Sequence, residues 1–163
     1  MLKGSGSWLR KFFKEFGESI MSVSASIDIT LAKKLPSSIK LISSLIAKGW
    51  RITNRGRVHF LPLGDKDDYD WKEQEIPEAQ LYDMIRQKES CKEKVGISIY
   101  WMNTDTGMDV LFLSERSIAF SLTINRRVLF DRITDVNWYL ERILPGLMGV
   151  DIVLEGFEFV QWF

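Results

Sequence analysis

Residues 23–31 alternate strictly between apolar and polar side chains, and this pattern constrains the fold more than any other stretch of the chain. The apolar positions are Val23, Ala25, Ile27, Ile29 and Leu31. A period of two is typical of a strand with one buried face, because successive side chains of a strand point to opposite sides. The segment is therefore predicted to be a half-buried strand.

The remaining patterns supply more strands than helices. Strands are expected at 50–52, 58–61, 95–101, 109–113, 118–124 and 150–162, and helices at 36–49, 76–87 and 134–144. Because most connections between them are short, the simplest architecture is an antiparallel sheet with the helices on one face. We predict one α+β domain over residues 21–163, with a mainly antiparallel sheet and about three helices packed on it.

Four local signals set boundaries within this order. The Asn54-Arg55-Gly56 turn predicts a hairpin, and Gly156 marks a bulge in the last strand. Thr134 is expected to cap the last helix, and Pro145-Gly146 is expected to break it.

The first twenty residues differ from the rest. A GSGS linker precedes an apolar stripe with helical spacing, which predicts an amphipathic helix formed by Trp8, Leu9, Phe12, Phe13, Phe16 and Ile20. Such a helix could lie on a membrane surface, pack on a partner or a second copy, or be an appendage ahead of a start at Met21. Because Glu15 and Glu18 interrupt its cationic face, we favour an extension, appended or native, that docks on protein, which is compatible with a homodimer.

Composition narrows the class of protein. The 163 residues are 45% hydrophobic and 12% aromatic, which is typical of one folded domain with a sizeable core. Residues 21–163 hold 18 basic and 20 acidic residues, so no basic field indicates a nucleic-acid partner. One cysteine and the absence of a run of ~18 apolar residues fit a cytoplasmic protein without a membrane-spanning segment.

The most informative stretch for function is Gly64–Glu78, GDKDDYDWKEQEIPE, which we call the acidic segment. It holds seven carboxylates and two aromatic residues. Carboxylates steer and position a basic partner, while aromatic side chains supply buried contact area. The predicted partner-binding residues are Asp65, Asp67, Asp68, Tyr69, Asp70, Trp71, Glu73 and Glu75. The alternative is a solvated loop that leads into a helix.

Catalytic and metal chemistry find little support. His59 is the only histidine, and Cys91 lies in a charged helix end, so an enzyme would need one of them in a pocket with carboxylate support. One histidine and one cysteine cannot build a usual zinc site. A calcium loop starting at Asp65 fails, because its sixth residue is Asp70 and its twelfth is Ile76. We therefore predict no catalytic residues, no metal and no cofactor.

Two arginine groups raise the alternative of single-stranded nucleic acid. Arg51, Arg55 and Arg57 follow Trp50, and Arg126, Arg127 and Arg132 form the second group. Aromatic residues flanked by arginines on a sheet can stack bases. The acidic segment would repel a phosphate backbone, so this stays the second interpretation.

The stretches GRVHFLPLGDKDDYDW, GISIYWMNTDTG, SIAFSLTINRR and ITDVNWYLERILP carry a resemblance across residues 21–163. In style the chain resembles the small cytosolic immunity proteins encoded beside contact-dependent growth inhibition and related polymorphic toxins. These families share no diagnostic motif, so no residue role is transferred. The resemblance implies a non-catalytic, stoichiometric inhibitor that binds a toxin domain. Many such toxins are basic nucleases, which the acidic segment would complement.

Overall fold

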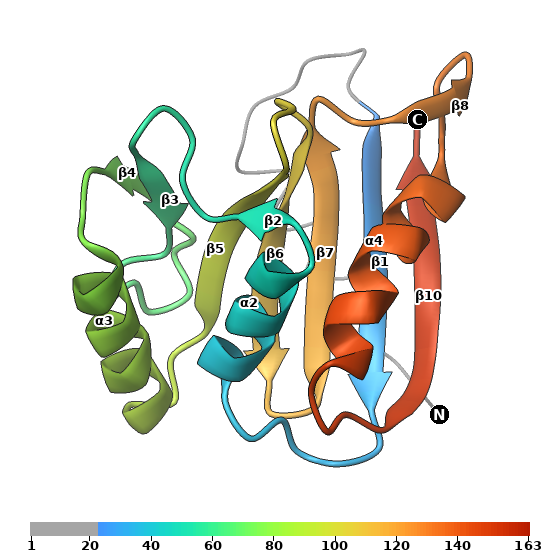
Figure 1. The fold of residues 1–163 in the computed structure, drawn as a ribbon. Coiled ribbons are helices and arrows are strands. Elements are labelled where there is room, and N and C mark those ends of the chain that lie inside the picture. The colour runs from blue at the N-terminus through green and yellow to red at the C-terminus, as the bar shows by residue number, and fades with distance from the viewer. Residues whose placement is uncertain (1–22) are drawn as a thin grey trace.

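The computed structural model describes residues 23–163, so the predicted N-terminal amphipathic helix lies outside the described residues. The strands are β1 (Ser24–Leu31), β2 (Trp50–Arg51), β3 (Val58–Phe60), β4 (Lys72–Gln74), β5 (Val95–Trp101), β6 (Gly107–Ser114), β7 (Ser117–Ile124), β8 (Val128–Phe130), β9 (Ile133–Thr134) and β10 (Leu154–Trp162). The helices are α2 (Ser38–Ala47), α3 (Glu78–Ser90) and α4 (Val136–Met148) (Figure 1).

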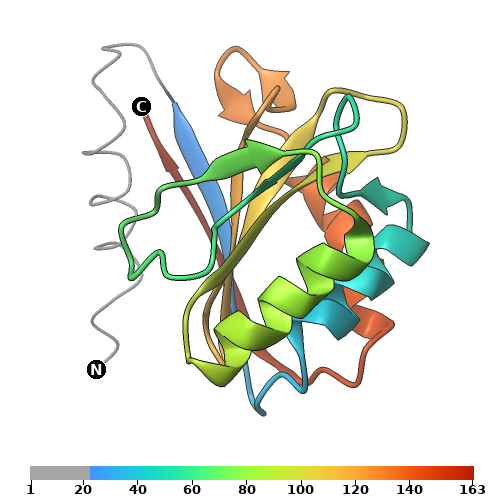
Figure 2. The ribbon, with the colours of Figure 1, turned by 90° about the vertical axis from the view of Figure 1, so that its left-hand side faces the viewer.

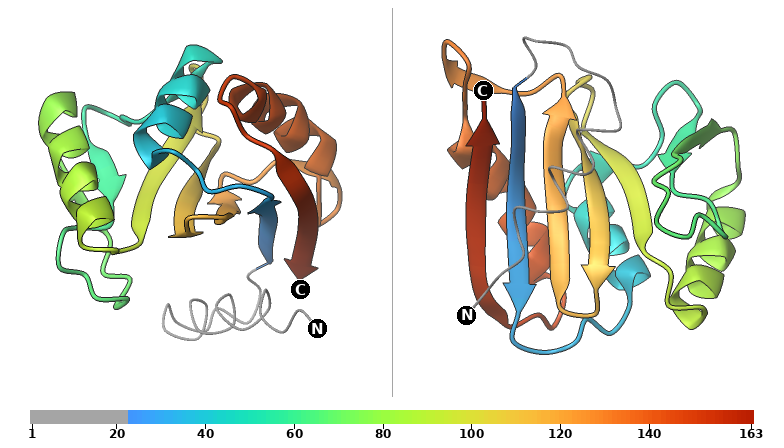
Figure 3. Two further views of the ribbon diagram at one scale, coloured as in Figure 1. Left: turned by 90° about the horizontal axis from the view of Figure 1, so that it is seen from below. Right: turned by 180° about the vertical axis from the view of Figure 1, so that it is seen from behind.

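A large antiparallel sheet carries the fold. Its strands run in the order β10-β1-β7-β6-β5-β3-β4, and β2 pairs separately with β5. Helices α2, α3 and α4 cover one face of this sheet, as the view from below shows (Figure 3). The predicted α+β class with a mainly antiparallel sheet and three helices is confirmed for the described residues.

The core lies between the sheet and its helices. The alternating apolar residues of β1, β5, β6 and β7 meet the apolar stripes of the three helices there. A smaller apolar cluster, Leu61, Tyr69, Leu111 and Ala119, lies on the opposite face. The side view shows α3 packed across the β5 end of the sheet (Figure 2).

Strand β1 is more deeply buried than a half-buried strand would be. Ile27 and Ile29 face the core as predicted, but Ser26 on the other face is 0% exposed. Ser26 stands between its cross-strand neighbours Val160 and Ser121.

Helix boundaries follow the predicted signals in part. The side chain of Ser37 caps α2 by accepting the Ile39 N–H at 3.2 Å. Helix α4 is capped by Asp135, which accepts the Trp138 N–H at 3.1 Å, and the prediction of Thr134 as the cap is wrong. Thr134 instead belongs to β9.

The predicted break of α4 at Pro145-Gly146 is also wrong, because the helix continues to Met148. Proline removes only one N–H, and this one falls near the end of the helix. Gly146 faces α2, where an added Cβ would lie 2.5 Å from Leu45 Cδ2. The Ser44 hydroxyl donates to the Gly146 carbonyl at 2.7 Å. Gly146 therefore serves close helix packing and does not end the helix.

The Asn54-Arg55-Gly56 turn forms, but it does not join a hairpin of paired strands. Asn54 and Arg57 exchange two backbone hydrogen bonds, of 2.9 and 3.0 Å. Strands β2 and β3 each pair with β5, because β5 is long enough to accept both along one edge. At Gly156 the predicted bulge is confirmed, since the β1–β10 register shifts beside it.

Three short strands were not predicted: β4 and the β8–β9 hairpin. All three residues of β4 are exposed and polar, so they show no alternation. No helix within residues 23–163 combines the length and the apolar character needed to cross a membrane.

Candidate functional site

The acidic segment forms the loop between β3 and β4 and the strand β4 itself. Asp65 is buried and turns into this loop, where its carboxylate accepts the Tyr69 N–H at 3.0 Å and the Asp70 N–H at 2.8 Å. Lys66, Asp67 and Tyr69 all have positive φ values, of 50°, 63° and 56°. Such residues persist where surrounding contacts over-determine the backbone. Asp65 therefore shapes the loop and presents no contact surface.

Tyr69 packs inward as well. It is 6% exposed and belongs to the small cluster on the sheet face opposite the helices. The Lys94 ammonium donates to its hydroxyl at 3.1 Å and lies 5.5 Å from its ring centroid. The expectation that Tyr69 offers its ring to a partner does not match this burial. Tyr69 supports the loop from below.

Trp71 is half-buried and links the acidic segment to the sheet. Its indole stacks on the His59 imidazole, with centroids 5.0 Å apart and planes inclined by 20°. An added Cβ at Gly96 would lie 2.8 Å from Trp71. Because no side chain rises from Gly96, the indole lies close against strand β5. Of the two predicted aromatic residues, Trp71 keeps part of its surface exposed.

The base of the loop is tied to α3. The Lys88 ammonium is buried and donates to the Pro62 carbonyl at 2.6 Å and to Glu93 at 3.2 Å. Glu93 in turn accepts the Gly64 N–H at 3.0 Å. That backbone hydrogen bond, with help from Lys88, lowers the pKa of Glu93. The carboxylate therefore stays ionised and holds the start of the acidic segment in place.

The other predicted carboxylates are exposed on this edge of the sheet, and we call them the acidic edge: Asp67, Asp68, Asp70, Glu73 and Glu75. Asp67 pairs with Lys94 at 3.3 Å and Asp70 pairs with Lys72 at 2.5 Å. Within residues 23–163, the remaining three have no ion pair. The acidic edge therefore keeps uncompensated negative charge.

Beside the acidic edge, a row of polar residues crosses the sheet face opposite the helices. Strand pairing aligns Glu73 with His59, Ser98 with Asp109, and Asp109 with Ser121. His59 joins the two halves, since its Nδ1 atom lies 2.6 Å from Ser98 Oγ. Ser98 also donates to Asp109. No alternation pattern indicated this row, because its members come from five different strands.

His59 sits at the rim of a hollow of about 460 Å³ that Glu73, Tyr100 and Asp105 also line. Asp109 lies behind it, 3.9 Å from His59 Nδ1. Burial raises the pKa of Asp109, while the hydrogen bond from Ser98 and the neighbouring His59 act in the opposite direction. The carboxylate support that an enzyme would require is therefore present behind His59.

The hydroxyl beside His59 belongs to Ser98 and is buried. Ser98 is 0% exposed, and Cys91 is exposed at the end of α3, outside this hollow. Residues 23–163 also contain no group of three His, Cys, Asp or Glu side chains that could hold a metal ion.

The aromatic residue of the first arginine group is not available to nucleic acid. Trp50 is 2% exposed, and its Nε1–H donates to the Arg142 carbonyl at 2.9 Å. Arg51 lies over the Tyr100 ring and donates to the Thr104 carbonyl at 2.8 Å. In the second group, Arg126 donates to Thr134 at 2.7 Å. The side chains that a base-stacking platform would need are therefore engaged in contacts within the chain.

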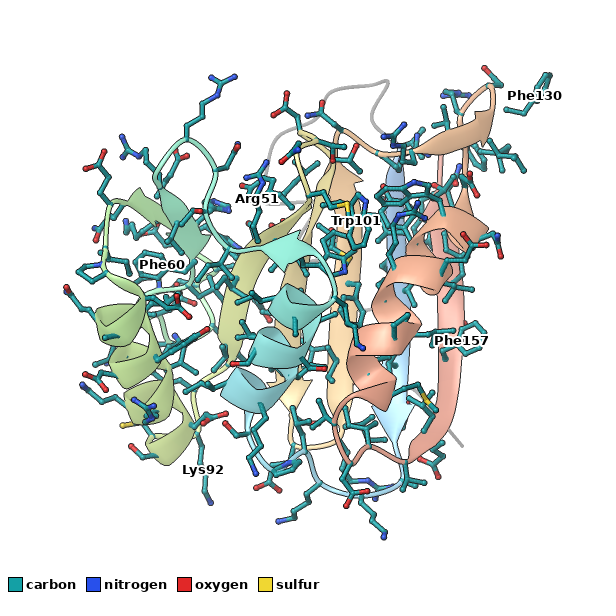
Figure 4. All side chains as sticks on the ribbon, in the orientation of Figure 1. Arg51, Phe60, Lys92, Trp101, Phe130 and Phe157 are labelled. Atoms are coloured by element: carbon teal, nitrogen blue, oxygen red, sulfur yellow. The ribbon has the colours of Figure 1, made fainter. Side chains whose placement is uncertain are left out.

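A further exposed surface lies at the opposite edge of the sheet. We call it the hairpin patch, and it comprises Val128, Leu129, Phe130 and Ile133 of the hairpin with Trp162 and Phe163 at the end of the chain. Phe130 projects from the tip of the β8–β9 hairpin, and Phe157 lies along β10 (Figure 4). The Arg132 guanidinium lies 5.5 Å from the Phe163 ring and joins the hairpin to the end of the chain. Exposed apolar patches of this kind are typical of contact surfaces.

No protein-family model, curated protein or solved structure matches the chain. The interpretation of the acidic edge and the His59 hollow rests on their geometry.

Proposed function

We propose that this chain is a non-catalytic cytosolic immunity protein, which binds a basic toxin domain and blocks or distorts its active site. The observation that supports this best is the acidic edge, where five exposed carboxylates follow one border of the sheet. The resemblance in the sequence points in the same direction.

The charges of the acidic edge would act mainly on association. Asp68, Glu73 and Glu75 have no ion pair within residues 23–163, although the Arg57 guanidinium, which donates to the Glu73 carbonyl at 2.8 Å, offsets part of the charge beside Glu73. Uncompensated charge of one sign raises the rate of encounter with a partner of the opposite sign, and salt weakens this effect. A basic toxin domain would be captured quickly at low salt.

The buried residues of the segment would act on the lifetime of the complex. Asp65, Tyr69 and Lys88 fix the loop before any partner arrives. A preformed loop does not have to be ordered on binding, which reduces the entropic cost of association. Trp71, half-buried beside the acidic edge, supplies an aromatic contact of the kind that dominates many interfaces.

The single-stranded nucleic-acid alternative has weaker support. It requires Trp50 to stack bases, and Trp50 is buried in the core. The neighbouring Arg51 contacts a backbone carbonyl and an aromatic ring of the same chain.

The test is a growth-protection assay. The protein encoded by the neighbouring reading frame is expressed from an inducible promoter, with or without this chain. We expect growth to stop without the chain and to continue with it. A variant with Asp67, Asp68 and Asp70 changed to asparagine should protect less well, because asparagine keeps the loop geometry but removes three negative charges.

A matched control removes three exposed carboxylates far from the acidic edge, in the variant D131N/E141Q/D151N. This control should protect as well as the unmodified chain. Failure of the unmodified chain to protect would contradict the proposal. Equal protection by both triple variants would remove the acidic edge from it.

A further inference from the structure

The His59 hollow is bordered by polar groups from four parts of the chain. His59 comes from β3 and Glu73 from β4, while Asp105 and Asn125 come from the turns that follow β5 and β7. The hollow opens on the sheet face opposite the helices and adjoins the acidic edge through Glu73. Its residues are brought together by strand pairing, since Glu73 lies directly opposite His59.

Hydrogen bonding assigns the proton on the His59 ring. The Ser98 hydroxyl has one proton, and it donates this proton to Asp109. With Asp109 ionised, Ser98 therefore acts as the acceptor at its contact with His59 Nδ1, 2.6 Å away. The neutral imidazole then carries its proton on Nδ1, and Nε2 is left as an acceptor.

The hollow is consequently rich in acceptors. Glu73 and Asp105 carry exposed carboxylates that form no ion pair within the described residues. Asn125 uses its Nδ2 to donate to the Asp105 carbonyl at 2.9 Å, which leaves its side-chain oxygen as an acceptor. Arg55 is the one cationic side chain in the described lining of this hollow.

A second hollow, of about 550 Å³, provides a contrast. It lies where the end of α3 meets the β6–β7 turn, and its carboxylates, Glu89, Glu93 and Glu115, already have partners within the chain. Lys34 pairs with Glu115 at 2.7 Å, and Glu89 accepts the Ser38 N–H at 2.7 Å. Of these two hollows, the His59 hollow is the one that combines unpaired carboxylates with an acceptor nitrogen.

We propose that the His59 hollow binds the guanidinium group of an arginine side chain. A guanidinium presents five N–H donors in one plane and pairs best with carboxylates, so it matches two carboxylates, an amide oxygen and His59 Nε2. The assignment of this arginine to the toxin domain rests on the proposed function. The affinity of the hollow for a guanidinium does not.

The probe is N-acetyl-L-arginine amide, titrated into the full chain and followed by amide and imidazole NMR shifts. The matched control probe is N-acetyl-L-citrulline amide, which has the same shape but no charge. We expect saturable shifts at His59, Glu73, Asp105 and Asn125, with a Kd on the order of 1–10 mM, and none with citrulline. Shifts of equal size with both probes, or shifts confined to other residues, would overturn the proposal.

Two exposed glutamates provide the matched variants. E73Q should weaken arginine binding about tenfold, because it removes a charge-assisted hydrogen bond from the lining. E141Q removes the same charge from an exposed residue of α4, outside both the hollow and the acidic edge, and should leave the affinity unchanged. An unaffected affinity in E73Q would contradict the proposal.

The two proposals fail in distinguishable ways. If arginine binds but the chain gives no protection from the protein encoded by the neighbouring reading frame, the arginine site is supported and the immunity function is contradicted. If the chain protects but arginine does not bind, the immunity function is supported and the arginine site is contradicted.

Discussion

The imidazole of His59 lies nearly parallel to the indole of Trp71, with ring centroids 5.0 Å apart. This stack joins two features that are separate in the sequence. Trp71 lies in the acidic segment, directly before β4. His59 belongs to the polar row that continues through Ser98 to Asp109. The acidic edge and the His59 hollow therefore form one continuous surface, held against strand β5.

The position of Trp71 depends on Gly96. In G96A, the new Cβ would lie 2.8 Å from side-chain atoms of both Trp71 and Leu61. This distance is shorter than the contacts that Cβ atoms make in proteins. We expect the indole to be displaced and the free energy of unfolding to fall by about 1–3 kcal/mol, as in other overpacked sites. Denaturant unfolding, followed by tryptophan fluorescence, measures both effects.

The matched control is G156A. An added Cβ at Gly156 meets nothing within 4 Å, and its φ is not positive. Its unfolding midpoint should stay close to that of the unmodified chain. If G96A were as stable as G156A and kept the same fluorescence, Trp71 would not lie against β5 as described.

Asp65 is expected to hold the loop shape. In D65A, the N–H groups of Tyr69 and Asp70 lose their shared acceptor, which should cost about 1–3 kcal/mol. Hydrogen exchange of these two amides should accelerate more than that of the core strands. D68A, which removes an exposed carboxylate from the same loop, should change stability by less than about 0.5 kcal/mol. Unchanged exchange at Tyr69 in D65A would show that the loop is held by other contacts.

Asp28 should make stability depend on pH. Burial raises its pKa from 3.8 to about 6; the neighbouring Ser26 hydroxyl opposes this rise and the nearby Glu158 adds to it. Between these two values the folded protein binds more protons than the unfolded chain, so the free energy of unfolding should fall as pH rises from about 4 to 6. The stabilisation that protonated Asp28 contributes is lost once the pH rises above about 6.

The variant D28N removes this dependence. Because Asp28 is only partly buried, we expect a discounted gain of about 1–2 kcal/mol at pH 7, and none below its unfolded pKa. Thermal unfolding across this pH range measures the difference, with D151N at an exposed site as the control. A gain of the same size at every pH would contradict the assignment to ionisation of Asp28.

The architecture could be predicted because its elements carry local periodicity. Strand β1 alternates over its whole length, and Ser37 caps α2 with the side chain expected of an N-cap. Elements without periodicity escaped prediction. Strand β4 is polar at every position, and it exists because β3 offers it a partner.

The break expected in α4 failed for a tertiary reason. Pro145 and Gly146 are poor helix residues by themselves, but Gly146 allows Leu45 of α2 to approach the helix closely. Packing between the two helices outweighs the local preference. The sequence alone does not show which helix will lie against Gly146.

The sequence indicated where carboxylates are concentrated, but not which of these side chains face solvent. The exposed carboxylates of Gly64–Glu78 lie on one edge of the sheet, yet Asp65 and Tyr69 point inward. Whether a residue in an irregular loop faces solvent depends on hydrogen bonds such as those of Asp65, which no spacing rule indicates. The link from His59 to Asp109 spans 50 positions and arises only from the pairing of β3, β5 and β6.

The most direct test is the rate of association with the cognate toxin domain as a function of salt. For the unmodified chain, we predict rapid binding that slows steeply as ionic strength rises. The triple variant of Asp67, Asp68 and Asp70 to asparagine should bind about tenfold more slowly at low salt and show a shallower dependence. An association rate that is the same in both proteins, with the same salt dependence, would contradict the role of the acidic edge.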